Sequence, residues 1–386
     1  MRFLSIVSLT ALFTIGQAAT LAPKTPSFVN ATIYNPPAGS QTSYARSTFL
    51  EVGNTKVIPP VLTTYAGGDH FVIYRSNDGG KSWKSISKAY FTNGNYTGGI
   101  ILRPFLYELP EDLGEVSAGT VFLSGNAIPG DFSSTNIELY ASTDKGRSWS
   151  FVSVVAVGGP PNTDNGAPCV WEPFILLHES QLAVYYSDQR DPKHDQKLCH
   201  QISTDALSWG PVINDVAYAN YTLRPGKITM AQIGNGQWMC SFELALAVDV
   251  PYAVHYKLAD SPFDFLKAKP IEMKASNTGT IPAAGPFITW PAAGGPDGTI
   301  VVSDSSYNQL FINKKNADPD SWIEVASGHG VGYTRSLYVV PGYGEKLVLL
   351  FNGGMYGEID TLVSDGTFTM PVRYSNWVSF YHLTKH

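Results

Sequence analysis

The chain has 386 residues, with 26 basic and 32 acidic side chains and a formal net charge of −6. This mildly acidic balance, without long blocks of like charge, argues against nucleic acid as a partner and favours a neutral or weakly charged substrate. Beyond the N-terminal segment, no stretch approaches the roughly 20 uninterrupted apolar residues of a transmembrane helix, so we expect no membrane association.

The N-terminal segment has the features of a secretory signal peptide. Arg2 precedes an apolar run over residues 3–15, and small residues follow at the place where a signal peptidase would cut. We therefore expect residues 1–18 to be removed on export and residues 19–386 to be secreted as a single catalytic domain. Passage through a glycosylating route agrees with three N-x-[ST] sequons, which begin at Asn30, Asn95 and Asn220.

The composition of the remaining chain favours one large all-β unit. Its 36 glycines and 26 prolines are spread evenly, with short β-type runs between them and no linker. Three cysteines allow at most one disulfide, so the fold depends on a large core and not on a cysteine framework. The sequence leaves open the pairing of Cys169, Cys199 and Cys240.

Two segments, residues 76–83 and 142–149, share the pattern S-x-D-x-G-x-x-W, the Asp box. Asp78 and Asp144 are placed to hydrogen-bond the backbone of their own turns. Each box also has a glycine that can adopt a positive φ and a tryptophan that can fill the space between strands. We interpret the box as a structural turn and not as a catalytic element.

Weaker copies of the box follow at residues 203–209, around Asp260 and at residues 320–322. The resulting period of roughly 50 to 70 residues fits a four-stranded blade in which the box joins the third strand to the fourth. Six such units fill the chain after the signal peptide. The sequence therefore predicts a six-bladed β-propeller in which the first strand of each blade lines the central channel.

A second repeat marks the start of each expected first strand, where equivalent residues should form a ring around the mouth of the channel. The six positions are Arg46, Arg103, Glu172, Arg224, Gly285 and Arg335. Because second strands run antiparallel to first strands, their ends return to the same mouth. Glu243, at the end of a second strand in the fourth unit, should therefore approach Glu172 in the third.

A pair of carboxyl groups is the common machinery for cutting a glycosidic bond, with one ionised as nucleophile and the other protonated as general acid. Glu172 suits the nucleophile, because a nearby arginine would favour its ionised form. The candidates for that arginine are Arg103, Arg224 and Arg335. In the alternative interpretation, Glu172 is only the partner of an arginine in the channel wall.

Glu243 suits the general acid. Partial burial on an aromatic strand end beside Trp238 and Phe242, together with the repulsion of a second carboxylate, would keep it protonated. It has the same alternative as Glu172, a structural ion pair.

Other residues at the mouth are candidates for contacting the substrate. They are Arg46, Arg103, Trp171, Arg224, Tyr333 and Arg335. The arginines have an alternative role as partners of strand-end carbonyls and carboxylates in the channel wall. Tyr333, on the same strand face as Arg335, would hydrogen-bond the substrate or a catalytic carboxylate, or would only pack.

The sequence gives no support to metal or phosphate chemistry. His194, Asp195, Cys199 and His200 match no common metal-site spacing, and we expect them in a solvated loop. There is no G-x-S-x-G elbow, and the glycine-rich residues 328–332 lead into a strand and not into a helix. We expect no metal and no cofactor.

Over nearly its whole length after the signal peptide, the chain resembles the fungal exo-1,5-α-L-arabinanases of glycoside hydrolase family 93. The resemblance rests on the residues around the two glutamates, 171–174 and 241–243, together with 44–46 and 223–226. Asp boxes are shared with sialidases and with several binding proteins, and they indicate architecture only.

This resemblance implies a sialidase-like propeller that cuts linear α-1,5-arabinan from its non-reducing end, releases arabinobiose and retains anomeric configuration, without a metal or cofactor. It places the nucleophile at Glu172, the acid/base at Glu243 and a site tyrosine at Tyr333. We therefore expect a secreted, monomeric enzyme whose partner is arabinan or an arabino-oligosaccharide.

Two other functions stay open. A sialidase would use Arg46, Arg224 and Arg335 to clamp a substrate carboxylate, whereas a non-catalytic propeller would only bind glycan at the mouth. Hydrolysis of neutral arabinan, hydrolysis of a sialoside, or hydrolysis of neither distinguishes the three.

Overall fold

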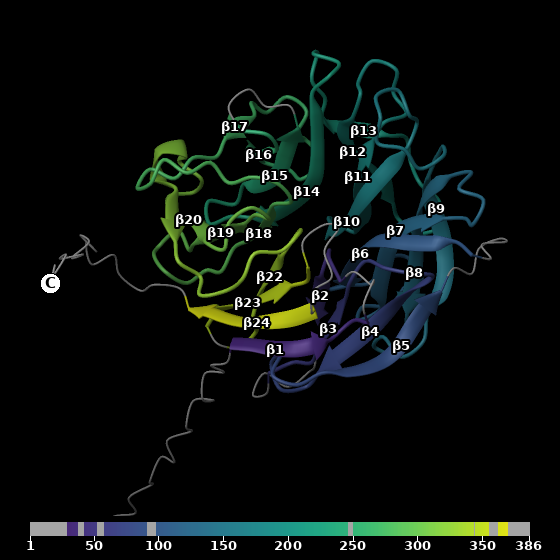
Figure 1. Cartoon of the computed structure of the whole chain (residues 1–386), viewed down its shortest axis with the longest axis horizontal. Helices are drawn as coiled ribbons and strands as arrows, with labels where there is room; N and C mark the ends of the chain where they lie inside the picture. The colour runs from purple at the N-terminus through teal and green to yellow at the C-terminus, as the bar shows by residue number, and fades with distance from the viewer. Residues whose placement is uncertain are drawn as a thin grey trace, which may run out of the picture.

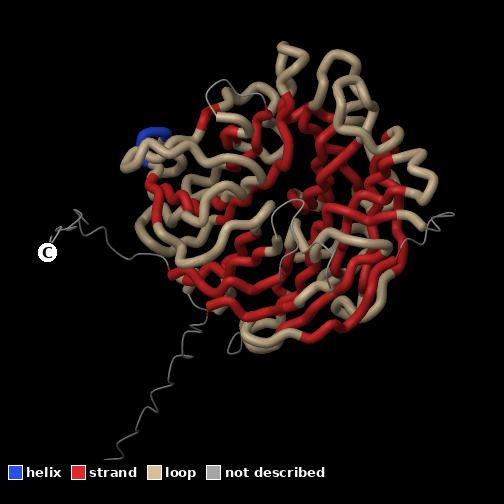
Figure 2. Tube along the Cα trace, in the orientation of Figure 1, coloured by secondary structure: helices blue, strands red, loops and turns tan. Residues whose placement is uncertain are grey.

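The computed structural model describes residues 29–37, 42–51, 58–90, 98–245, 250–342, 344–354 and 362–369. The predicted signal peptide and the sequon at Asn95 lie outside these ranges. Within them the chain is almost entirely strand and loop (Figure 2), and the one described helix is the 3-10 turn η1 (Pro319–Ser321). No helix of the described residues has the length and apolar character needed to cross a membrane.

The described strands form six antiparallel sheets of four strands each. The first strands are β2 (Arg46–Phe49), β6 (Ile100–Glu108), β10 (Val170–His178), β14 (Arg224–Gln232), β18 (Phe287–Thr289) and β22 (Ser336–Val339). The second strands are β3 (Val61–Thr64), β7 (Val121–Ile128), β11 (Gln181–Asp188), β15 (Trp238–Ala245), β19 (Ile300–Ser303) and β23 (Leu347–Asn352). The third strands are β4 (His70–Ser76), β8 (Thr135–Ser142), β12 (Lys197–Ser203), β16 (Ala253–Ala259), β20 (Leu310–Asn313) and β24 (Leu362–Thr369). The fourth strands are β5 (Lys84–Tyr90), β9 (Ser150–Gly158), β13 (Ile213–Val216), β17 (Ile271–Glu272), β21 (Ile323–Val325) and β1 (Val29–Tyr34).

The sheets are arranged around a common centre, and Figure 1 shows them following one another in chain order. Five sheets are each built from four consecutive strands. The remaining sheet joins the two ends of the described chain, because β1 pairs with the outer side of β24. The first strands contact those of their neighbours in a closed series from β2 through β22 and back to β2. The predicted all-β propeller with four-stranded blades is confirmed.

Burial explains why many strands show continuous apolar runs instead of strict alternation. The second strands β7, β11 and β15 are buried along almost their whole length, because neighbouring sheets cover both of their faces. Outermost strand β5, by contrast, is largely exposed and carries Lys84 and Lys88, charges that discourage pairing with another chain. Aromatic rings connect adjacent sheets, as where Phe105 of β6 and Phe174 of β10 lie 4.6 Å apart between ring centres.

The two strong turn repeats have the hydrogen bonds that the sequence predicts. Asp78 Oδ1 accepts from two backbone N–H groups of its own turn at 3.0 and 2.9 Å, and Asp144 Oδ1 does the same. Gly80 and Gly146 have positive φ values of 93° and 85°. Trp149 reaches the neighbouring sheet, where its Nε1 donates to a serine hydroxyl of β5 at 3.1 Å. These turns join third to fourth strands and hold neighbouring sheets together.

The cysteines play no part in crosslinking. Cys169, Cys199 and Cys240 are all free and buried, so the disulfide that the sequence allowed is not formed. Among the described sequons, Asn30 lies in β1, and Asn220 is exposed on the loop between β13 and β14.

Candidate active site

The first strands share a left-handed backbone conformation at the end that the sequence assigns to the channel mouth. The residues at or just before these strands with φ from 49° to 66° are Tyr44, Arg103, Glu172, Lys227, Gly285 and Thr334. In β6, β10 and β14 the register with the second strand shifts around this residue, as in a β-bulge. A bulge redirects a side chain and is common beside active sites. A left-handed conformation outside glycine costs about 1 to 3 kcal/mol and persists where the surrounding structure enforces it.

The mouth therefore has a different composition from the predicted ring. Arg103, Glu172 and Gly285, three of the six predicted ring residues, have this left-handed conformation. In three other sheets the residue differs from the predicted arginine, with Lys227 in place of Arg224, Tyr44 in place of Arg46 and Thr334 in place of Arg335. The prediction placed the arginine of each short motif at the mouth. The bulge that decides which residue of a motif lies there cannot be located from the sequence.

Glu172 of β10 is a buried carboxylate surrounded by donors. Its Oε2 accepts from Ser187 Oγ and from the backbone N–H of Lys227, both at 2.9 Å. Its Oε1 lies 3.5 Å from Lys227 Nζ and 3.7 Å from Arg103 Nε. Burial alone would raise the pKa of Glu172, but the charges of Lys227 and Arg103 and these hydrogen bonds lower it below its usual value. The carboxylate is thus held ionised, as a nucleophile requires.

Glu243 of β15 lies beside Glu172, on the adjacent sheet. Its Oε1 accepts from Lys227 Nζ at 2.5 Å and its Oε2 from the backbone N–H of Gly285 at 2.7 Å. The predicted apolar setting is wrong, because side chains alternate along a strand. Phe242 accordingly lies fully buried and stacks on His255, with ring centres 5.9 Å apart. A lysine ammonium takes the place expected for apolar surface.

The two carboxyl groups are close together. Since Lys227 Nζ lies 3.5 Å from Glu172 Oε1 and 2.5 Å from Glu243 Oε1, these two oxygens are separated by no more than the sum of the distances, 6.0 Å. Gly226 lies between them, and a Cβ at that position would be 3.4 Å from an oxygen of each glutamate. The predicted approach of Glu172 and Glu243 at one mouth is therefore confirmed by the geometry, and Gly226 leaves the space between them open.

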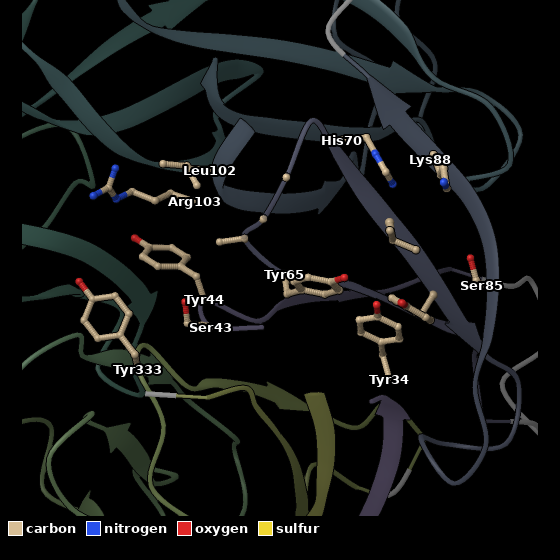
Figure 3. A pocket seen from close by; sticks show the side chains of 15 residues that line it. Tyr34, Ser43, Tyr44, Tyr65, His70, Ser85, Lys88, Leu102, Arg103 and Tyr333 are labelled. Atoms are coloured by element: carbon tan, nitrogen blue, oxygen red, sulfur yellow. The ribbon is translucent and has the colours of Figure 1, made fainter. Parts of the chain in front are cut away.

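A pocket of about 930 Å³ lies beside this centre, over the first sheet and Tyr34 of β1, and Arg103, which pairs with Glu172, lines it while neither glutamate does. Arg103, Tyr44 and Tyr333 line its inner end, where their side chains gather as Figure 3 shows. Burial raises the pKa of both tyrosines, which keeps their hydroxyls protonated. Tyr34, Tyr65, Tyr74 and His70 line the outer part. The predicted site tyrosine Tyr333 thus lies in the pocket wall.

Trp171 packs against Arg103, one of the residues at the inner end of the pocket. The Arg103 guanidinium lies 4.3 Å from the centre of the Trp171 ring, and Trp171 Nε1 donates to Gln189 Oε1 at 2.6 Å. This stack fixes the arginine beside Glu172. The indole is almost fully buried, and its contact in this structure is with Arg103, while its predicted contact with substrate stays a prediction.

The other three predicted arginines lie in the channel wall and not in the pocket lining. Arg335 is fully buried and donates to backbone carbonyls of the 304–309 loop and of Gly330 at 2.6 to 3.4 Å. Arg46 Nη1 donates to two backbone carbonyls, both at 2.8 Å. Arg224 pairs with Asp195 at 2.8 Å. These bonds to protein groups favour the structural alternative for the three arginines, and a contact with substrate stays a prediction.

The residues with a metal-like composition do not gather around a common point. Asp195, Cys199 and His200 are buried, so the expected solvated loop is wrong for them. His200 Nδ1 faces Asp215 at 2.9 Å, and His194 Nδ1 faces the Tyr218 carbonyl at 2.8 Å. Across the part of the chain that the structure describes, no group of three or more His, Cys, Asp or Glu side chains could hold a metal ion.

Two residues of the centre were missed by reasoning from the sequence. Lys227 contacts both glutamates, and Tyr44 lies at the inner end of the pocket. The available signal was the motifs themselves, because Lys227 directly follows 223–226 and Tyr44 is the first residue of 44–46. The bulges that turn both residues toward the centre only become visible in the structure.

Comparison with known proteins gives matches among solved structures. No family model and no curated protein matches the chain. The α-L-arabinofuranosidase of Fusarium graminearum, solved with arabinobiose, is 36% identical, with 89% of this chain and 98% of that chain covered and a TM-score of 0.83. An α-L-arabinanase of Penicillium chrysogenum, also solved with arabinobiose, matches with the same values. A sialidase of Streptococcus pneumoniae is 12% identical over 88% of this chain and 70% of that one, with a TM-score of 0.57, which indicates a shared fold alone.

Proposed function

Because this chain belongs to glycoside hydrolase family 93, the family of the matched Fusarium enzyme, we propose that it hydrolyses linear α-1,5-L-arabinan with Glu172 as nucleophile and Glu243 as acid/base. The observation that carries the proposal is the pair of buried carboxyl groups, whose Oε1 atoms are no more than 6.0 Å apart, beside a pocket that Arg103 lines. Retaining enzymes place these groups about 5 to 5.5 Å apart, and inverting enzymes about 6.5 to 9.5 Å apart. The geometry therefore supports retention.

The reaction takes two steps. Glu172 first attacks the anomeric carbon while Glu243 gives its proton to the glycosidic oxygen, so the bond to the leaving sugar breaks and a glycosyl ester forms on Glu172. Glu243, now a carboxylate, then removes a proton from a water whose oxygen attacks the same carbon. The ester breaks, Glu172 returns as a carboxylate and Glu243 is protonated again.

The hydrogen bonds support this division of roles. Glu172 faces the Ser187 hydroxyl, the Lys227 N–H and two cationic groups, all of which stabilise a negative charge. Among the described residues, the hydrogen bonds to the Glu243 carboxyl come from one cationic group and one backbone N–H. The better-compensated carboxylate suits the group that stays ionised, and the other suits the group that carries the proton.

We also propose exo action with release of arabinobiose. The pocket is lined by Arg103, which contacts Glu172, and not by Gly285, which contacts Glu243. It therefore lies on the side of the nucleophile, where the non-reducing end of the substrate would sit. Its volume of about 930 Å³ is near the upper end of the roughly 300 to 1,000 Å³ typical of small-molecule sites, which suits more than one sugar ring.

The finer architecture and the location of the protein form part of the proposal. We infer that the sheet joining β1 to β22–β24 is the sixth blade of a sialidase-like propeller, and that the turns at Asp78 and Asp144 are Asp boxes. The signal-like segment and the exposed Asn220 support secretion and glycosylation. We propose a monomer that binds arabinan and neither nucleic acid nor membrane.

Incubation of the secreted protein with linear arabinan, and separately with a sialyl-lactose, tests the proposed function. We expect arabinobiose as the main early product from arabinan and no release of sialic acid. An early ladder of longer oligosaccharides would replace exo with endo action. Release of sialic acid would indicate a sialidase, which the structure disfavours because Arg46, Arg224 and Arg335 are engaged within the channel wall. Binding of arabinan without any product would indicate a glycan-binding propeller.

A further inference from the structure

Lys227 is placed between the two catalytic glutamates. Its Nζ donates to Glu243 Oε1 at 2.5 Å and lies 3.5 Å from Glu172 Oε1. Its backbone N–H donates to Glu172 Oε2 at 2.9 Å. One residue thus contacts Glu172 through both its main chain and its side chain, and it reaches Glu243 as well.

The contacts of Lys227 depend on an unfavourable backbone conformation. Its φ of 55° lies in the left-handed region, and the pairing of β14 with β15 shifts register between Gly226 and Thr229. A regular strand would not direct both the N–H and the side chain of one residue to the same partner. Strain of this kind in a lysine, which has a Cβ, is characteristic of positions that the function requires.

Lys227 is buried, and the charges around it keep it cationic. Burial alone would lower the pKa of its ammonium, but Glu172 and Glu243 raise it well above its usual value. Tyr333 and Tyr44 face the same ammonium, and the Tyr333 ring centre lies 5.1 Å from Nζ. Arg103 approaches the same oxygen of Glu172 as Lys227 does, and among the described residues these side chains are the titratable and charged groups that act on the ammonium or on Glu172.

We propose that Lys227 is a positioning residue that keeps Glu172 ionised and aimed into the channel while it holds Glu243 at the short separation that retention requires. The inference rests on the proposed function and adds a residue to it. The ammonium of Lys227 compensates the buried charge of Glu172 and at the same time holds Glu243 by a hydrogen bond. In the absence of the ammonium, Arg103 would be the only cationic side chain in an ion pair with Glu172 among the described residues.

Replacing Lys227 with methionine tests the proposal. Removing a positive charge from beside Glu172 raises the pKa of that carboxyl, so the acidic limb of the kcat/KM profile should move to higher pH. A charge at this distance shifts a carboxyl pKa by about 1 to 3 units, so we expect a displacement of about one unit or more. Lys227→Arg, which keeps the charge, should restore the position of the limb even where its rate is lower.

Lys257→Met is the matched control. Lys257 is also a buried lysine, but its Nζ donates to the backbone carbonyls of Asp215 and Phe265 at 2.9 and 3.0 Å, away from both glutamates. It should lose stability without a shift of the acidic limb. A folded Lys227→Met enzyme whose limb coincides with that of the wild type would overturn the proposal, and Lys227→Gln replaces the methionine variant if that one does not fold.

A second measurement separates this proposal from the proposed function. Carbon-13 NMR of protein labelled at the glutamate carboxyls, with Glu172 assigned by its loss in Glu172→Gln, follows the ionisation of Glu172 without any substrate. Its titration should move to higher pH in Lys227→Met and not in Lys257→Met. If the wild type cuts no arabinan, the proposed function fails, but this titration still decides the role of Lys227. An unchanged titration refutes that role even in an active enzyme.

Discussion

Glu172→Gln should abolish turnover of arabinan while the protein stays folded. The amide has nearly the same shape and keeps its place near Ser187 and Lys227, but it cannot form the glycosyl ester on which the first step depends. Removing a covalent nucleophile of another hydrolase costs on the order of 10⁶ in kcat, and we expect a loss of at least about 10⁴-fold here. Initial rates on arabinan, together with the melting temperature, measure this.

Glu108→Gln is the matched control for that variant. Glu108 is a partly buried glutamate of a first strand with a largely covered side chain, and it pairs with a lysine, Lys145, at 2.5 Å, but it lies toward the opposite end of β6 from Arg103. Its replacement should lower stability and leave kcat within a few-fold of the wild type. If folded Glu172→Gln turns over arabinan at a near-normal rate, Glu172 is not the nucleophile.

Glu243→Ala should be slow on arabinan and recoverable by a small anion. Without Glu243 no group protonates a poor leaving group, which costs about 10² to 10⁴-fold. An aryl arabinoside with a good leaving group needs no such proton, so it should still form the ester on Glu172, and hydrolysis of that ester then becomes limiting. Azide needs no general base, so it should enter the space left by Glu243 and restore turnover.

The configuration of the azide product shows from which side of the sugar azide attacks. Azide that attacks from the side of Glu243 displaces Glu172 and gives the glycosyl azide with the configuration of the substrate. In Glu172→Ala, which leaves space in place of the nucleophile, azide would attack from the opposite side and give the inverted product. Absence of rescue in a folded Glu243→Ala protein, by azide and by formate alike, would remove Glu243 from the acid/base role.

The blades and the glutamates could be predicted from the sequence because short-range patterns encode them. The turn at Asp144 is fixed by hydrogen bonds within one segment. Because such turns recur about once per four-stranded unit, their spacing along the chain indicates the length of a blade. Glu172 and Glu243 followed from a topological rule, since the first strand begins where the second ends. Neither inference needed the detailed conformation of a strand.

The remaining features of the site depend on conformation that the sequence does not display. A left-handed residue shifts the ring by three positions in β14, which exchanges Arg224 for Lys227. Arg335 has the same side chain as Arg103, but the 304–309 loop folds around it and uses its donors. The closing of the last sheet by β1 joins segments at opposite ends of the described chain, which no local repeat could indicate.

Proton NMR of the first product released from arabinan tests the central claim most directly, because the anomeric signal reports how the two glutamates cooperate. Direct attack by Glu172 followed by attack of water from the side of Glu243 inverts the anomeric carbon twice. We therefore predict that the α-anomer appears first and that the β-anomer grows in only as mutarotation proceeds. A β-anomer at the earliest time points would mean a single inversion by water and would contradict the assignment of Glu172 as a covalent nucleophile.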